Sequence, residues 1–184
     1  MQRIRLNGIK DILFWIIIPV VAIGVLVLFD QLTKIWFTNL YEANGSTEFI
    51  KGVLSFTHTI NTGSAFSFLS GKPWAQTFFK VFTVISLCLF VVLYLYVLTK
   101  KYKTLAVSTT LIISGTIGNF IDRLLINGVV DFIRFDFIDF PIFNLADICL
   151  TFGVIIFIVH FFFLDENAIF RKESKRPLGV LLLG

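Results

Sequence analysis

Charged residues are scarce in this 184-residue sequence: Asp, Glu, Lys and Arg together make up 15%, whereas hydrophobic residues make up 57%. A soluble fold of this size would have too little polar surface with such a balance. The formal net charge of +4 comes from basic residues clustered between apolar runs, so a face that follows a phosphate backbone is not indicated. The composition predicts a membrane protein of one domain.

Cysteine and histidine are also scarce, with two of each. Cys88 and Cys149 lie within apolar stretches, so we interpret them as small buried hydrophobic residues and not as a disulfide framework or a zinc site. Neither His58 nor His160 stands in an HExxH pattern, and we expect His58 in a surface loop and His160 packed near the cytoplasmic end of the last apolar segment. We expect no metal and no cofactor.

Four segments are long and apolar enough to cross a membrane, and in lipid each must be helical. They are residues 12–36, 74–98, 105–125 and 141–164. The first follows basic residues, as in a signal peptide, but it exceeds the usual apolar length of about 7 to 15 residues and no small-x-small cleavage site follows. The prediction is an all-α membrane protein whose single domain spans residues 1–164, with a cytoplasmic tail at 165–184.

Basic residues predict the orientation of this domain. One side of the predicted membrane carries most of them: Arg3, Arg5, Lys10, Lys100, Lys101, Lys103, Arg171, Lys172, Lys175 and Arg176. Cytoplasmic loops are enriched in Lys and Arg, so both termini should be cytoplasmic and the loops at 37–73 and 126–140 extracytoplasmic. In the first of these loops, short apolar stretches broken by glycine and serine at 49–69 predict a small β-sheet at the membrane surface.

Ionisable side chains inside the spans need a partner, an interfacial position or a function, since each costs about 2.5 to 3.5 kcal/mol on insertion scales. Asp30 and Lys34 are four residues apart, the favourable order for an ion pair on one helix face. Lys80 can extend its ammonium group toward the interface. An anchoring role at the outer end of the helix explains these residues without any catalytic function.

The third span contains small and polar residues near its outer end. Gly115 and Gly118 are three residues apart, which predicts close approach of another helix. Asn119 lies three and four residues before Asp122 and Arg123, so it should lie beside both. Asp122 and Arg123 are adjacent and should have separate partners, and the planar fork of Arg123 suits carbonyl or phosphate oxygens of a ligand.

Two further acids are predicted at the same depth. Asp131 follows two valines just outside the third span, and Asp147 lies three residues after Asn144 at the start of the fourth. A carboxylate in the first turn of a helix is stabilised by the helix dipole, so Asp147 has a structural interpretation as well. Apolar surroundings raise carboxyl pKa values, and two neighbouring carboxyl groups do not easily ionise together.

Such a pair can activate water. The charged carboxylate takes a proton from water that attacks an amide carbonyl, and the protonated one donates to the carbonyl oxygen and later to the leaving nitrogen. Arg123 and Asn144 could hold the substrate backbone or stabilise the developing charge. A serine nucleophile lacks a base, because His160 is expected at the opposite end of its helix.

Five short stretches resemble the lipoprotein signal peptidases, the bacterial signal peptidase II enzymes of aspartic peptidase family A8. Residues 30–34 are similar to D-x-x-x-K and residues 61–66 to N-x-G-x-A-F. Residues 118–123 together with 128–132 are similar to G-N-x-x-D-R followed by G-x-V-x-D-F, and residues 143–147 to F-N-x-A-D. The ordered set is specific, although any one motif alone would be weak.

The resemblance implies an intramembrane aspartic endopeptidase of the bacterial cell membrane, with Asp131 and Asp147 as catalytic residues. It implies that Asn61, Gly63, Asn119, Arg123 and Asn144 bind substrate, and that Asp30, Lys34 and Asp122 support the structure beside the site. The implied substrates are prolipoproteins that carry diacylglyceryl on the cysteine after the cleavage site, with membrane lipids around them. Globomycin-type peptides are implied as inhibitors.

Two other classes are compatible with a polytopic membrane protein. A proton- or ion-coupled carrier would distribute Asp30, Asp122, Asp131 and Asp147 through the membrane depth. A binding module or assembly scaffold would use the outer sheet to dock partners, which leaves the paired acids without a role. The predicted gathering of the acids near one face favours interfacial chemistry over both.

Overall fold

The computed structural model describes residues 8–42, 44–63, 69 and 71–164. Several features considered above lie outside the described residues: Arg3 and Arg5, residues 64–66 of the N-x-G-x-A-F motif, and the tail at 165–184 with its four basic residues. The four predicted membrane-spanning helices and the small sheet are present.

The first span runs without a break from α1 (Ile9–Ile12) through a π-helical turn (Leu13–Ile17) to α2 (Ile18–Leu40). The second and third spans are α3 (Ala75–Lys100) and α4 (Lys103–Ile126), joined by a tight turn with Lys101 in the left-handed region at φ 54°. The fourth is α5 (Leu145–Val159), continued by a π-helical turn (His160–Leu164). It begins four residues later than predicted, because Asn144 caps it.

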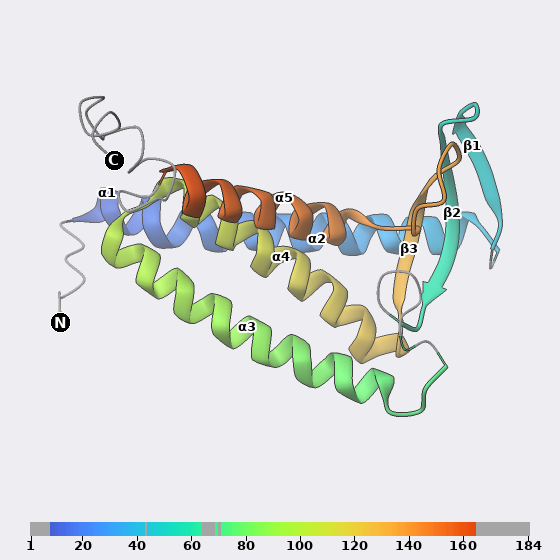
Figure 1. The fold of residues 1–184 in the computed structure, drawn as a ribbon, viewed down its shortest axis with the longest axis horizontal. Helices are drawn as coiled ribbons and strands as arrows, with labels where there is room; N and C mark the ends of the chain where they lie inside the picture. The colour runs from blue at the N-terminus through green and yellow to red at the C-terminus, as the bar shows by residue number, and fades with distance from the viewer. Residues whose placement is uncertain (1–7, 43, 64–68, 70, 165–184) are drawn as a thin grey trace, which may run out of the picture.

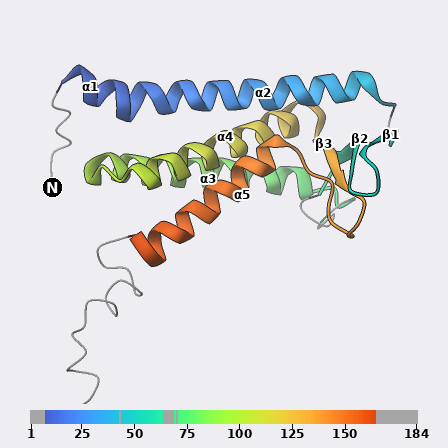
Figure 2. The ribbon, with the colours of Figure 1, turned by 90° about the horizontal axis from the view of Figure 1, so that it is seen from above.

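Helix α4 is the centre of the bundle and packs against α2, α3 and α5, whereas α3 makes its main helix contacts with α4. Figures 1 and 2 show the sheet at one end of the bundle, with α1, the α3–α4 turn and the end of α5 at the other. Large apolar side chains on α2, α3 and α5 face outward, as expected of helices surrounded by lipid. Cys88 is among the outward-facing residues, so its predicted burial is wrong.

The predicted close packing at two glycines of α4 is confirmed. A Cβ on Gly115 would lie 2.3 Å from the carbonyl oxygen of Ala146, and one on Gly118 would lie 2.6 Å from Oδ2 of Asp30. Both approaches are too close for any side chain. Gly115 therefore lets α5 pack directly on α4, and Gly118 leaves room for the Asp30 carboxylate of α2.

The sheet has three antiparallel strands in the order β1 (Ser46–Ile50), β2 (Leu54–Asn61) and β3 (Val129–Phe135). The sequence predicted strands in the first outer loop only, so β3 was missed. Its partner lies about 70 residues earlier in the chain, with Asn61 opposite Val129 and Thr59 opposite Asp131. Both faces of β3 are buried over Val129–Phe132, which obscures the alternation that marks a half-buried strand.

Aromatic rings attach the sheet to the C-terminal end of α2. The Phe37 ring stacks on Phe132 of β3 with a centroid distance of 4.4 Å and lies 4.9 Å from Phe56 of β2. His58 is buried in β2, with Nε2 3.5 Å from Oγ1 of Thr38, so its predicted surface-loop position is wrong. His160 is buried at the other end of the bundle against Tyr102 and Thr104, as predicted.

We expect Gly115→Ala to destabilise the protein by about 1 to 3 kcal/mol, the usual cost of forcing an extra methyl group into a packed core. The measurement is thermal unfolding of purified protein in detergent. Gly24→Ala is the matched control, since a Cβ at Gly24 of α2 has no atom within 4 Å. Equal unfolding temperatures for both variants would contradict the direct contact of α4 with α5.

Candidate functional site

A buried lysine near the sheet end of α2 is the centre of a charged cluster. The Lys34 ammonium group lies 2.9 Å from Asp30 Oδ2, 3.0 Å from Asp122 Oδ2 and donates to Asn119 Oδ1 at 3.1 Å. All four side chains are buried. The ion pair predicted between Asp30 and Lys34 is present, and Asp122 makes it a triad. Three acceptors match the three protons of an ammonium group.

The two carboxylates of this cluster also hold the backbone of other elements. Asp30 Oδ1 accepts from the N–H of Ala146 at 2.9 Å, in the first turn of α5. Asp122 Oδ2 accepts from the N–H of Val130 at 3.0 Å, in β3. The Gln31 side chain donates to both acids. The cluster therefore joins α2, α4, α5 and β3 at one point.

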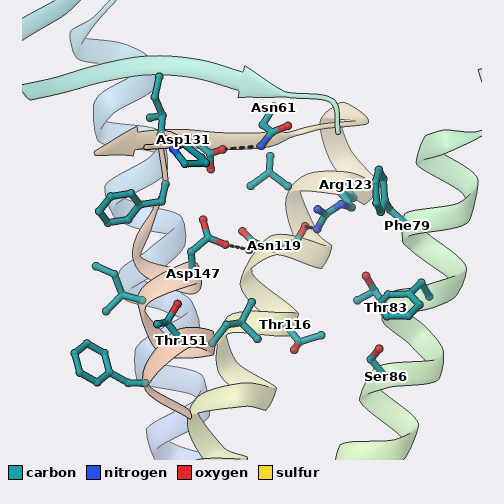
Figure 3. Close-up of a pocket in the computed structure, with 18 of the residues that line it drawn as sticks. Asn61, Phe79, Thr83, Ser86, Thr116, Asn119, Arg123, Asp131, Asp147 and Thr151 are labelled. Carbon is teal, nitrogen blue, oxygen red and sulfur yellow. Dashed lines mark hydrogen bonds between the residues drawn. The ribbon is translucent and has the colours of Figure 1, made fainter. Parts of the chain in front are cut away.

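Asn119 connects the charged cluster to Asp147, one of the two candidate catalytic residues. Lysine can only donate, so the amide oxygen of Asn119 must face Lys34 and its nitrogen must face away. That nitrogen donates to Asp147 Oδ1 at 2.7 Å (Figure 3). The orientation of the Asn119 amide, and with it one hydrogen bond to Asp147, is set by the charge on Lys34.

Asn144 joins the two candidate carboxyl groups. Its oxygen accepts from the Asp147 N–H at 3.0 Å, while Asp147 Oδ2 accepts from the Asn144 N–H at 3.2 Å, a capping box that begins α5. Its amide nitrogen donates to Asp131 Oδ1 at 2.7 Å and to Asn119 Oδ1 at 3.1 Å. Asn144 has no exposed surface, so it holds the carboxyl groups from behind.

Asp131 lies on the face of β3 that also carries Val129 and is 3% exposed. Its Oδ2 accepts from the Asn61 side-chain nitrogen at 3.1 Å, and the Asn61 oxygen accepts from the Gly63 N–H at 2.9 Å, which fixes the direction of that amide. Burial, and then the neighbouring Asp147, raise the pKa of Asp131 from its ordinary 3.8 to about 7. The carboxyl group of Asp131 therefore holds a proton well above the pH at which an exposed aspartate loses it.

Asp131 and Asp147 both line a cavity of about 1040 Å³ that opens between α3 on one side and α4 and α5 on the other. Most of its lining is apolar and aromatic. Its polar lining residues gather into the carboxyl pair with Asn61, Asn119 and Arg123, and a set of hydroxyl groups deeper in the bundle. In Figure 3 the Asp147 side chain extends from α5 toward the level of the strand that carries Asp131.

Arg123 stands at the wall of this cavity opposite the carboxyl pair. Its guanidinium lies 5.3 Å from the centroid of the Phe79 ring on α3, and Nη1 donates to the Asn119 carbonyl oxygen at 3.4 Å. Among the described residues no carboxylate lies within ion-pairing distance of it. Arg123 and Asp122 have separate partners, as predicted, and Arg123 keeps donors for a bound molecule.

The model of the signal peptidase (SPase) II family matches residues 21–163. The chain belongs to this family. It is similar to lipoprotein signal peptidases of Streptococcus agalactiae, with 41% identity over 87% of this chain and 96% of the relative, and of Lactiplantibacillus plantarum, with 44% identity over 73% and 87%. A bacterial membrane enzyme solved by the in meso method at 2.3 Å resolution aligns with a TM-score of 0.74 and 34% identity, over 89% of this chain and 94% of that one.

The structure brings the residues singled out by the signal peptidase II motifs into one connected site. Asp131, Asp147, Asn61, Asn119 and Arg123 line the cavity. Asn144, Asp30, Lys34 and Asp122 lie behind it, and Gly63 orients Asn61. The four acids gather at the sheet end of the bundle, which is not the distribution expected of a carrier. Two contributors were missed: Gln31, which gave no signal beyond its place between Asp30 and Lys34, and Phe79, one of 23 phenylalanines.

We expect Lys34→Met to destabilise this signal peptidase II family member by about 3 to 5 kcal/mol, because removing one partner leaves buried carboxylates uncompensated. Thermal unfolding in detergent is the measurement. The matched control is Lys101→Met, which breaks an ion pair with Asp11 at 2.8 Å whose side chains are 43% and 28% exposed. That pair should contribute about 1 kcal/mol or less. An equal loss of stability in the two variants would contradict the conclusion that the charged cluster holds the helices together.

The raised pKa of Asp131 predicts a pH-dependent stability. Between 3.8 and about 7 the folded state keeps a proton that the unfolded chain has lost. Folding stability should therefore fall as pH rises through this window, by at most about 1.4 kcal/mol per pH unit. Unfolding temperatures of wild type and Asp131→Asn from pH 4 to 8 test this: the variant should gain stability relative to wild type as pH rises to 7. A constant difference would show an ordinary pKa at Asp131.

Proposed function

We propose that this protein is the endopeptidase that removes signal peptides from prolipoproteins, cleaving before a cysteine that carries diacylglyceryl, with Asp131 and Asp147 as its catalytic residues. The observation that carries the proposal is the carboxyl pair on one cavity, joined through the shared contacts of Asn144. Membership in the signal peptidase II family and the lipoprotein signal peptidase relatives support it.

The surroundings of the two carboxyl groups differ, and the difference supports separate roles for them. Asp131 is almost fully buried and its pKa is raised to about 7, so it is the carboxyl group that holds the proton. Asp147 lies in the first turn of α5, where the helix dipole favours a negative charge, and accepts from the Asn119 amide and the Asn144 N–H. Asp147 is therefore the carboxylate that acts as base.

In the proposed reaction, the Asp147 carboxylate takes a proton from water as the water oxygen bonds to the carbonyl carbon of the scissile amide. Asp131 donates its proton to the carbonyl oxygen, which gives a tetrahedral diol. The C–N bond then breaks as the proton held by Asp147 passes to the leaving nitrogen, and one hydroxyl of the diol returns its proton to Asp131. Both carboxyl groups end in their starting states.

Arg123 holds the substrate in this scheme. Its guanidinium lies at the cavity wall over the Phe79 ring, and among the described residues no carboxylate lies within ion-pairing distance of it. Planar donors of this kind suit carbonyl oxygens. Asn61 and Asn119 keep the carboxyl groups directed into the cavity through their amide nitrogens. Globomycin-type peptides would inhibit by occupying the same cavity.

The site faces the extracytoplasmic side in this proposal, with both termini in the cytoplasm. Figure 1 shows α1 and the turn from α3 to α4 at the end of the bundle away from the sheet. Helix α1 carries Lys10, and that turn carries Lys100, Lys101 and Lys103. Basic residues favour the cytoplasmic side, which places the sheet and the carboxyl pair opposite. The apolar signal segment and the lipid chains of a substrate would then enter between α3 and α5 from the bilayer.

We expect Asp131→Asn and Asp147→Asn each to lower turnover by about 100- to 10,000-fold, since either change removes half of the proton exchange. The assay uses purified protein and a prolipoprotein with a diacylglyceryl cysteine, and mass spectrometry identifies a product that begins at that cysteine. Asp139→Asn, an exposed acid on the same side of the bundle, is the control and should keep full activity. Full activity in either dyad variant, or a wild type that does not cleave this substrate, would overturn the proposal.

A further inference from the structure

Three hydroxyl groups in the cavity are set apart by their lack of hydrogen bonds. Thr83 and Ser86 lie on α3 and Thr151 lies on α5, and all three line the cavity. Thr83 is 8% exposed, Ser86 is half-buried and Thr151 is exposed. In the described part of the chain, none of the three has a hydrogen-bond partner.

The serine and threonine hydroxyl groups of α4 behave differently. Thr109, Thr110, Ser114 and Thr116 of α4 each donate to the carbonyl oxygen one turn earlier, at 2.7 Å. This is the usual solution where no water is available to a helical serine or threonine. Thr116 lines the same cavity, yet its hydroxyl is already paired with Ile112. The hydroxyls of Thr83, Ser86 and Thr151 remain available to a molecule in the cavity.

These hydroxyls lie on the membrane side of the carboxyl pair. Thr151 follows Asp147 by four residues on α5, one helical turn or about 6 Å further from the sheet. Thr83 follows Phe79, which packs on Arg123, by one turn of α3. Figure 3 shows Thr83 and Ser86 on one wall and Thr151 on the opposite wall. An extended peptide covers about 3.3 Å per residue, so about two residues of a substrate reach from the carboxyl pair to the hydroxyl groups.

A peptide cleaved at the dyad needs hydrogen bonds at this level. The scissile carbonyl must be open to water, so the residues beside it cannot be helical and their N–H and C=O groups lose their internal partners. In a water-poor cavity each unpaired group costs several kcal/mol. A hydroxyl group can donate to a carbonyl oxygen and accept from an N–H, and therefore can pair with either.

We propose that Thr83, Ser86 and Thr151 form a subsite that hydrogen-bonds the main-chain amides of the two or three substrate residues preceding the scissile bond. The inference rests on the proposed function and deepens it. The residues before the bond belong to the apolar signal segment, so they approach from the bilayer and pass these hydroxyls. The subsite stabilises extended backbone and is indifferent to side-chain identity, which suits an enzyme that processes substrates of different sequence.

The first test compares apolar variants of near-equal volume in the purified full-length protein. Thr83→Val, Ser86→Ala and Thr151→Val should each lower kcat/KM for a lipidated prolipoprotein by about tenfold, the value of one hydrogen bond, with unfolding temperatures unchanged. Thr83→Ser and Thr151→Ser, which restore the hydroxyl group, should recover most of the kcat/KM lost in the valine variants. Thr116→Val is the matched control, since it changes the same cavity but removes a hydroxyl already paired within α4. Wild-type kcat/KM in all three apolar variants would overturn the subsite.

The second test changes the substrate backbone. Amides before the scissile bond are replaced singly by esters, which removes the N–H and weakens the carbonyl acceptor without changing a side chain. At one or more positions, wild type should lose about tenfold in kcat/KM, and the variant lacking the matching hydroxyl should lose no more. If, at every position, the ester lowers kcat/KM by the same factor in the variant as in wild type, the hydroxyl groups do not contact the peptide backbone.

A third substrate separates the peptide from its lipid. Ether-linked chains lack the ester carbonyls of diacylglyceryl and leave the peptide unchanged. The variants should lose as much with this substrate as with the ester-linked one. If the ether substrate removes the difference between variants and wild type, the hydroxyls bind the lipid and the peptide subsite is wrong. A wild type that cleaves neither lipidated substrate overturns the proposed function, whereas wild-type cleavage with unaffected variants overturns the subsite alone.

Discussion

The contact between Lys34 and its three oxygen acceptors determines how the rest of the site is built. A buried ammonium is tolerated in a membrane bundle only when its charge and its protons are matched, and Asp30, Asp122 and Asn119 match them. Each of these acceptors then acts on another element. Asp30 holds the start of α5, Asp122 holds β3, and Asn119 turns its nitrogen toward Asp147. The Lys34 ammonium group thus helps to position both α5 and β3, the elements that carry the two carboxyl groups.

Three asparagine side chains donate hydrogen bonds to the carboxyl pair in fixed directions. Asn61, Asn119 and Asn144 each have one end fixed by a group that can only donate: the Gly63 N–H, the Lys34 ammonium and the Asp147 N–H. Their nitrogens must therefore face the carboxyl groups. Asn144 is both the cap of α5 and a partner of Asp131, so the start of the helix and the geometry of the pair cannot change independently.

Much of this could be predicted from the sequence because it depends on local patterns. Four apolar runs give the four spans, and the spacing of Asp30 and Lys34 gives their ion pair. The glycines of α4 signal close packing, and the short motifs identify the acids and amides of the site. The spans, the ion pair and the glycine packing follow from helical periodicity and from the cost of polar groups in lipid, both of which act within a few residues. The residues of the site were identified through the resemblance of the motifs to the signal peptidase II family.

What could not be predicted depends on contacts between distant segments. Strand β3 exists through its pairing with β2, and the burial of His58 follows from the docking of β2 on α2. The start of α5 depends on a hydrogen-bonded box at Asn144, which an apolar run of residues does not reveal. Cys88 faces outward because α3 packs mainly on α4, which leaves the rest of its surface without a packed helix.

Helix α3 forms one wall of the cavity, whereas the carboxyl pair is held by other elements. This helix packs mainly on α4, and neither acid of the pair, nor Lys34 or any of the three asparagines, is carried by it. The carboxyl pair and the residues that hold it come from α2, α4, α5 and the sheet, and α3 forms the other side of the cavity. Replacement of residues on the inner face of α3 can thus change the shape of the cavity while the carboxyl pair and its hydrogen-bond partners stay in place.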